Sequence, residues 1–290
     1  VLTEHIVPYG DGREAAFAWT SGIKNWGWGA EGWQGKVVIR NNLVRDGLPV
    51  LWAPHPAGRH GHGIWADEVL KPTARPQIHD NRVVNCYSRG IYIEKTDDHD
   101  VFNNVVINCA QVRFTAAIEA QSNPFGYDVM KDEADNNAPR KVSGNRIYHN
   151  TTLGGWWTFS VNCSSANCSI SNTEVRDNLF IGSRPAKAGL YLYGGGANDS
   201  VHGDGNHYIN NCFGERGQWV WGDTVYRTVN ELEAASDGAI RKTLDGRPTF
   251  TDPEKGIFRL APGSIGRNAA SDGGDVGARR LTFTKKPQLL

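Results

Sequence analysis

Two short segments of the sequence end in a carboxylate, and these residues are the best candidates for chemistry. Residues 63–67 read Gly-Ile-Trp-Ala-Asp and end at Asp67, and residues 90–94 read Gly-Ile-Tyr-Ile-Glu and end at Glu94. Both segments alternate between apolar residues and other residues, which predicts β-strands with one buried face. A pair of carboxylates held close together can cleave a glycosidic bond.

A recurring motif predicts the elements that position these two residues. An apolar residue is followed three positions later by asparagine, and a short alternating strand follows after a further strand and a turn. The asparagines of the motif are Asn42, Asn81, Asn104, Asn145, Asn178 and, less regularly, Asn206. A repeat of short strands without helical periodicity is typical of a parallel β-helix. We expect the asparagines to form one internal ladder of hydrogen bonds.

We therefore predict an all-β fold, namely a single-stranded right-handed parallel β-helix with long inserted loops and a C-terminal cap. Residues 1–215 would form about six rungs, and residues 216–290 would form a capping segment of the same domain, with a short helix near 228–236. Segments 48–62, 69–76 and 122–140 are rich in proline, glycine and charge, so we expect loops that wall a cleft.

In such a coil the apolar residues of the second strands point inward, and the residues between them form two columns on the opposite face. The aromatic column would hold Lys24, Trp65, Tyr92, Glu119, Ser160 and Tyr191. The acidic column would hold Asp67, Glu94, Gln121, Asn162 and Tyr193. Aromatic rings together with carboxylates and amides are typical of a sugar-binding groove. We expect both columns to bind a polysaccharide or oligosaccharide.

The spacing of the rungs predicts the chemistry of the acidic column. Neighbouring rungs lie roughly 4.8 Å apart, which brings Asp67 and Glu94 near the roughly 5–5.5 Å carboxyl separation of retaining glycosidases. Two like charges this close favour one shared proton. We expect Asp67, which is short and rigid, to be the nucleophile and Glu94 to be the acid/base.

The same two strands resemble those of glycoside hydrolase family 120, the β-helical β-xylosidases. In that family a Gly-Ile-Trp-x-Asp strand carries the nucleophile, and the strand on the next rung ends in the acid/base. The resemblance implies these roles for Asp67 and Glu94. More broadly, the chain resembles right-handed parallel β-helix carbohydrate-active proteins of the pectin-lyase-like type. The segment Phe258 to Ser264 is similar to the closing phrase of many secreted bacterial β-helix proteins, which implies a secreted or periplasmic location.

Two other functions fit the same residues. In a polysaccharide lyase, Asp67, Glu94 and Glu119 would hold Ca²⁺ beside a uronate. The candidate bases for that reaction are Lys24, Lys95, Arg89 and Arg113. In a non-catalytic glycan-binding β-helix, the columns would hold a glycan without cleaving it.

Composition argues against several other partners. Lysine plus arginine (31) balances aspartate plus glutamate (31), so we expect neither a nucleic acid nor an anionic membrane as partner. The histidines at 55, 60 and 62 match no metal-binding spacing, so we expect no metal and no cofactor, apart from Ca²⁺ in a lyase. The five cysteines exclude a complete disulfide framework. The start at Val1 is interpreted as that of a processed or truncated chain.

Overall fold

A computed structural model describes most of the chain. It covers residues 21–26, 37–47, 61–67, 69–111, 115–122, 140–163, 168–182, 190–194, 205–214, 219–222 and 224–279. Side chains are described at all of these positions except 26, 140–141, 162–163, 168 and 190–194. Of the three expected loops, most of 48–62 and of 122–140 therefore lies outside the described residues.

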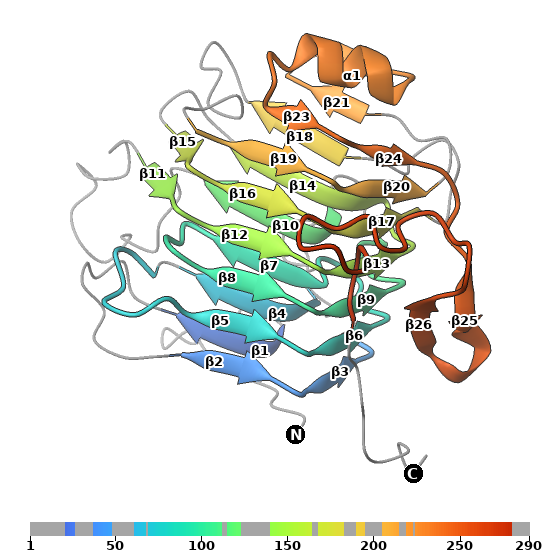
Figure 1. The fold of residues 1–290 in the computed structure, drawn as a ribbon. Coiled ribbons are helices and arrows are strands. Elements are labelled where there is room, and N and C mark those ends of the chain that lie inside the picture. Colours follow the sequence, from blue (N-terminus) through green and yellow to red (C-terminus); the bar gives the residue numbers. More distant parts are fainter. Residues whose placement is uncertain are drawn as a thin grey trace, which may run out of the picture.

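Three sheets make up the body of the protein, and the strands of each sheet are stacked along the coil (Figure 1). The first contains β1 (Ser21–Trp26), β4 (His62–Asp67), β7 (Ile91–Glu94), β10 (Ala116–Ser122), β14 (Trp157–Cys163), β18 (Leu190–Gly194), β21 (Trp219–Trp221) and β22 (Thr224–Tyr226). The second contains β2 (Val38–Arg40), β5 (Gln77–His79), β8 (Asp100–Phe102), β12 (Arg146–Tyr148), β16 (Glu174–Arg176), β19 (His207–Ile209) and β23 (Ile240–Arg241). The third contains β3 (Leu43–Arg45), β6 (Arg82–Val84), β9 (Val105–Ile107), β13 (Thr151–Leu153), β17 (Leu179–Ile181), β20 (Cys212–Gly214) and β24 (Leu244–Asp245).

The chain visits these three sheets in turn. From β4 onward, the strands of these sheets pair in parallel with the strand one circuit before them, as β4 pairs with β1 and β7 pairs with β4. The exception is β22, which pairs antiparallel with β21. Two circuits carry an additional strand, β11 (Arg140–Ser143) and β15 (Cys168–Ser171), which pair with each other. This strand order is that of a parallel β-helix, so the predicted all-β fold is confirmed.

A ladder of asparagines, buried except at its half-buried first member, lies at the turn between the second and third sheets. Its members, each hydrogen-bonded to the next through the side-chain amide, are Asn42, Asn81, Asn104, Asn150, Asn178 and Asn211. The prediction was wrong for Asn145 and Asn206, which accept hydrogen bonds from His99 N and Thr173 N at a different turn. Strands β11 and β15 create this second turn, and the same sequence motif occurs at both turns.

The core is a column of apolar side chains inside the coil. Ile64 and Ala66 of β4 are fully buried in it, and Ile91 and Ile93 of β7 pack on them from the next rung. Gly63 precedes Ile64 because the space is closed: a Cβ at Gly63 would lie 2.3 Å from Val83 Cγ1 and 2.5 Å from Gly90 O. The strand spacing at β4 therefore depends on this glycine.

One end of the coil is covered by α1 (Val229–Ala235), which confirms the helix expected near 228–236. Val229 and Leu232 point from α1 into the core, and the helix lies beyond β21 and β23 (Figure 1). Because β21, β23 and β24 add to the three sheets, the coil continues past the predicted boundary at 215. Among the described residues, no helix is long and apolar enough to cross a membrane.

The chain after β24 packs along the side of the third sheet, whereas the sequence predicts that it covers the last rung. It forms the antiparallel pair β25 (Phe250–Asp252) and β26 (Ile257–Leu260), with a 3₁₀ turn at Pro253–Lys255 between them. The segment that follows crosses several rungs (Figure 1). Its backbone N–H groups bind Asp177 O, Thr151 Oγ1 and Asn103 Oδ1 at 2.8, 2.9 and 2.7 Å.

Candidate active site

Asp67 and Glu94 are register partners at the ends of adjacent parallel strands. Asp67 closes β4 and Glu94 closes β7, and their Cα atoms pair directly. Each residue follows an isoleucine or alanine that points into the core, so both side chains extend from the opposite face of the sheet. The first sheet therefore places two carboxylates one rung apart, about 4.8 Å along the stack.

The strand register extends both predicted columns. Along the acidic column, Glu94 pairs with Gln121, which pairs with Asn162, which pairs with Tyr193. Along the aromatic column the paired residues are Lys24, Trp65, Tyr92, Glu119, Ser160 and Tyr191. The side chains of Asn162 and Tyr193 lie outside the described part of the structure, so only their backbone positions are known.

Both columns are more buried than the sequence predicts. The exposed fraction is 2% for Asp67, 7% for Glu94 and 1% for Trp65, although none of them points into the apolar core. These side chains pack against each other and against cations from neighbouring rungs. An open groove lined by the aromatic column is therefore absent from the described residues, whereas Gln121 remains half-buried.

Two lysines contact Asp67, one from each side. Lys24 Nζ on β1 lies 3.2 Å from Asp67 Oδ2, and Lys95 Nζ lies 3.4 Å from Asp67 Oδ1. Two ammonium groups at this distance stabilise the ionised form of a buried carboxylate. Burial lowers the pKa of Lys24, and the charge of Asp67 opposes that shift.

Lys95 contacts Asp67, and the spacing of the repeat does not predict this contact. It directly follows Glu94, its side chain is 5% exposed, and its backbone has φ of 49°. This left-handed conformation is uncommon for a lysine and costs of order 1 kcal/mol. It turns the side chain from the rung of Glu94 back toward Asp67. The sequence named Lys95 only as a candidate base, because nothing in a Glu-Lys-Thr turn reveals such a conformation.

The rings of the aromatic column form a closed stack with cations. Trp65 and Tyr92 stack with centroids 5.7 Å apart. Lys24 Nζ lies 3.5 Å from the centroid of Trp65, and the guanidinium of Arg89 lies 4.2 Å from that of Tyr92. The fully buried ring of His62 packs on both. Trp65 and Tyr92 thus belong to a buried stack, in place of the open platform for a sugar that the sequence predicts.

Glu119 also makes internal contacts. Its Oε1 accepts a hydrogen bond from Arg89 Nη2 at 2.8 Å, and its Oε2 accepts one from Ala116 N at 3.2 Å. The residue is fully buried. Both carboxylate oxygens are thus hydrogen-bonded to the protein, and Glu119 holds Arg89, which lies over the ring of Tyr92. The sequence predicts instead that Glu119 binds substrate.

Gln121 differs from these residues because it is only half-buried. Its Oε1 accepts a hydrogen bond from the hydroxyl of Tyr92. Burial, reinforced by the charge of Glu94, raises the pKa of that hydroxyl, so Tyr92 acts as a donor. The acidic column therefore offers a carboxyl group and an oriented amide next to each other.

The described residues contain no group of three or more histidine, cysteine, aspartate or glutamate side chains arranged to hold a metal ion. Of the other predicted candidates, Arg113 and the histidines at 55 and 60 lie outside the described residues. Cys86, Cys109 and Cys212 are buried free thiols.

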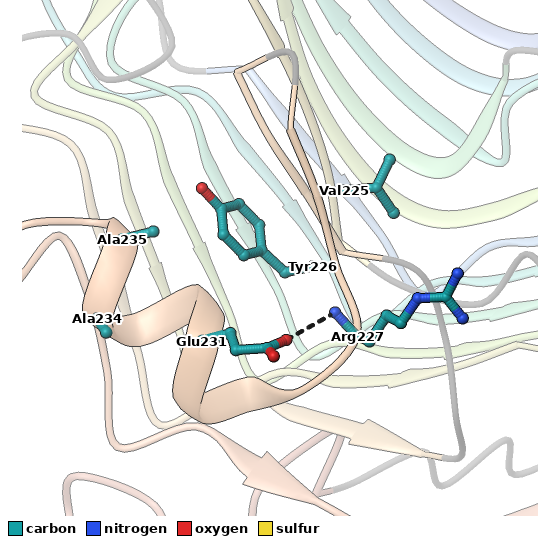
Figure 2. A pocket seen from close by; sticks show the side chains of 6 residues that line it. All are labelled: Val225, Tyr226, Arg227, Glu231, Ala234 and Ala235. Carbon is teal, nitrogen blue, oxygen red and sulfur yellow. Dashed lines mark hydrogen bonds between the residues drawn. The ribbon is translucent and has the colours of Figure 1, made fainter.

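A separate hollow lies at the α1 end of the coil (Figure 2). It is lined by Val225, Tyr226, Arg227, Glu231, Ala234 and Ala235. Glu231 caps α1, because its carboxylate accepts hydrogen bonds from the backbone N–H groups of Arg227 and Thr228. The acid in this hollow therefore has a structural role, and the hollow lies several strands away from Asp67.

Comparisons with protein-family models, with curated proteins and with solved structures find no match for this chain.

Proposed function

We propose that the chain is a retaining glycoside hydrolase that acts on a polysaccharide or oligosaccharide, with Asp67 as nucleophile and Glu94 as acid/base. The supporting observation is the direct register of Asp67 with Glu94 on the face opposite the core. Carboxyl groups on adjacent rungs start about 4.8 Å apart, and retaining glycosidases use a separation of roughly 5–5.5 Å.

The charges around Asp67 suit a nucleophile. Lys24 and Lys95 favour its ionised form, which is the form that attacks. The attack on the anomeric carbon uses a lone pair of a carboxylate oxygen of Asp67. Glu94 lies one rung away, where it can exchange a proton with the bridging oxygen.

The reaction then follows two steps. Glu94 donates its proton to the bridging oxygen while Asp67 attacks the anomeric carbon, so that the glycosidic bond breaks and an ester to Asp67 forms. Glu94, now ionised, takes a proton from a water molecule that attacks the same carbon. The ester breaks, the sugar leaves with its original configuration, and both carboxyl groups return to their starting state.

A polysaccharide lyase is the second candidate, and one observation favours it. Burial lowers the pKa of Lys24, and an amine that is more easily neutral is a better base for a proton next to a uronate carboxyl group. In that reaction Lys24 would take the C5 proton, the bond to the leaving oxygen would break, and an unsaturated sugar would remain.

Substitution of the two carboxylates tests the proposal and separates the candidates. The wild type, Asp67→Asn and Glu94→Gln are incubated with neutral and uronate-containing polysaccharides, and reducing ends and unsaturated ends are measured in parallel. We expect reducing ends without ultraviolet absorbance, and losses of at least about a hundredfold in both variants. Asp245→Asn and Glu174→Gln, at positions remote from the site, are the matched controls. Activity within a few-fold of the wild type in either site variant contradicts the proposal, and unsaturated products favour the lyase.

A further inference from the structure

Gln121 follows Glu94 in the acidic column, on the side away from Asp67. Its Cα pairs with that of Glu94, which pairs in turn with that of Asp67. The order along the stack is therefore nucleophile, acid and amide, with steps of about 4.8 Å. A pyranose unit has a similar length, so successive rungs can meet successive sugars.

The orientation of the Gln121 amide is set by a buried neighbour. Tyr92 donates its hydroxyl hydrogen to Gln121 Oε1, and Lys95 N donates to the backbone oxygen of Gln121 at 2.8 Å. The carbonyl end of the amide faces Tyr92, so the NH₂ end, with two hydrogen-bond donors, faces the other way. Within the described structure this NH₂ group donates to no protein acceptor, and Gln121 as a whole is half-buried, in contrast to the buried Asp67 and Glu94.

We propose that Gln121 binds the sugar on the leaving-group side of the cleaved bond, so that the glycan lies along the stack with its leaving group toward β10. This inference rests on the proposed function, since it takes Asp67 as nucleophile and Glu94 as acid. Asp67 must lie at the anomeric carbon and Glu94 at the bridging oxygen. The direction from Asp67 to Glu94 is then the direction from the attacked sugar to the leaving group, and the next side chain is Gln121.

The chemistry of the amide defines the leaving group. Two N–H donors match a hydroxyl oxygen of a sugar unit, so the substrate class is an oligosaccharide whose leaving group is itself a sugar. An aryl leaving group has no hydroxyl at this place. Comparison of the two kinds of leaving group therefore isolates the contribution of Gln121.

The test compares a disaccharide with the aryl glycoside of the same sugar. The probes are xylobiose with 4-nitrophenyl β-xyloside, cellobiose with 4-nitrophenyl β-glucoside, and β-1,4-galactobiose with 4-nitrophenyl β-galactoside. For the pair that the wild type hydrolyses, Gln121→Ala and Gln121→Glu should lower the ratio of kcat/KM for disaccharide over aryl glycoside about three- to tenfold. Gln121→Glu keeps the size of the side chain and removes the two donors; it also adds a negative charge beside Glu94, which acts on both substrates of a pair. Tyr92→Phe frees the amide to rotate and should lower the ratio less.

The controls are Gln77→Ala and Tyr148→Phe, which lie on the second sheet and should leave the ratio unchanged. A wild-type ratio in both Gln121 variants overturns this inference, and it leaves the proposed function standing if Asp67→Asn and Glu94→Gln are inactive. A reduced ratio in Gln121→Ala with a wild-type ratio in Gln121→Glu overturns the donor role. Failure of the wild type to hydrolyse any pair counts against the proposed function and removes the inference with it.

Discussion

Lys95 Nζ lies 3.4 Å from Asp67 Oδ1, although the backbone of Lys95 belongs to the next rung of the coil. The contact crosses from the strand that ends in Glu94 to the strand that ends in Asp67. It depends on the left-handed backbone conformation of Lys95, with φ of 49°. The turn that ends the strand of Glu94 thus supplies one of the ammonium groups beside Asp67, and Lys24 on β1 supplies another.

Replacement of Lys95 by methionine should destabilise the protein and reduce activity. The change leaves the buried carboxylate of Asp67 with only one of its two ammonium neighbours. Because Lys24 remains, we expect a loss of about 1–3 kcal/mol in the free energy of unfolding, less than for complete removal of a buried partner. Urea denaturation of the wild type and the variant measures this loss. Lys242→Met is the control, since Lys242 is exposed and also has a positive φ of 56°. Equal stability of the two variants would show that the contact with Asp67 contributes nothing.

The asparagine ladder should be most sensitive to substitution in its interior. Asn104 donates to Ile78 O and to Asn150 Oδ1 and accepts from Asn81, all in buried surroundings. Asn104→Ala leaves several of these groups unpaired, so we expect a loss of about 2–4 kcal/mol. Asn42→Ala, at the half-buried first position, should cost about 1 kcal/mol or less. Thermal or urea unfolding compares the two, and a similar cost at both positions would argue against a cooperative internal ladder.

Stability should fall as the pH drops below neutrality, partly because of His99. Burial lowers the pKa of His99 from 6.5 to about 4 in the folded protein. Between these values the unfolded chain binds a proton at this residue and the folded chain does not, so acid favours unfolding. The stability that depends on neutral His99 is fully present above pH 6.5 and is lost as the pH falls toward 4. This loss lowers the free energy of unfolding by at most about 3 kcal/mol.

A His99→Asn variant isolates this effect. The free energy of unfolding is measured from pH 4.5 to 7.5 in both proteins. Its slope against pH gives the number of protons taken up on unfolding, and this number should be smaller in the variant by up to one. His149 remains as a second histidine whose pKa is lowered by burial, so some slope should persist. An identical slope in both proteins would contradict the assignment.

The sequence predicted the fold and the register well because both follow from local alternation. The segments ending at Asp67 and Glu94 have the same length and the same apolar positions, and in a coil of stacked strands identical patterns align. The asparagine motif predicts the wrong residue at Asn145, which follows β11, and at Asn206, which directly precedes β19. Val142 precedes Asn145 and Ile147 precedes Asn150 by the same three residues, so spacing alone does not distinguish the two turns.

The surroundings of the site were harder to predict because they come from turns. Arg89 and Lys95 flank β7 and lie in irregular segments, yet Arg89 covers Tyr92 and Lys95 reaches Asp67. Alternation within a strand predicts which face of the sheet a side chain points from. It does not predict which side chains from neighbouring turns pack over it. Alternation therefore predicts an exposed ring at Trp65, whereas Lys24 from the preceding rung lies over that ring in the structure.

Trapping of the covalent intermediate tests the central claim most directly. The protein is incubated with an activated 2-deoxy-2-fluoro glycoside of the sugar that it hydrolyses best, digested, and analysed by mass spectrometry. We predict a single glycosyl adduct on the peptide that contains Asp67, and no adduct in Asp67→Asn. An adduct on another residue, or hydrolysis with inverted configuration and no adduct, would contradict the pairing of Asp67 as nucleophile with Glu94 as acid/base.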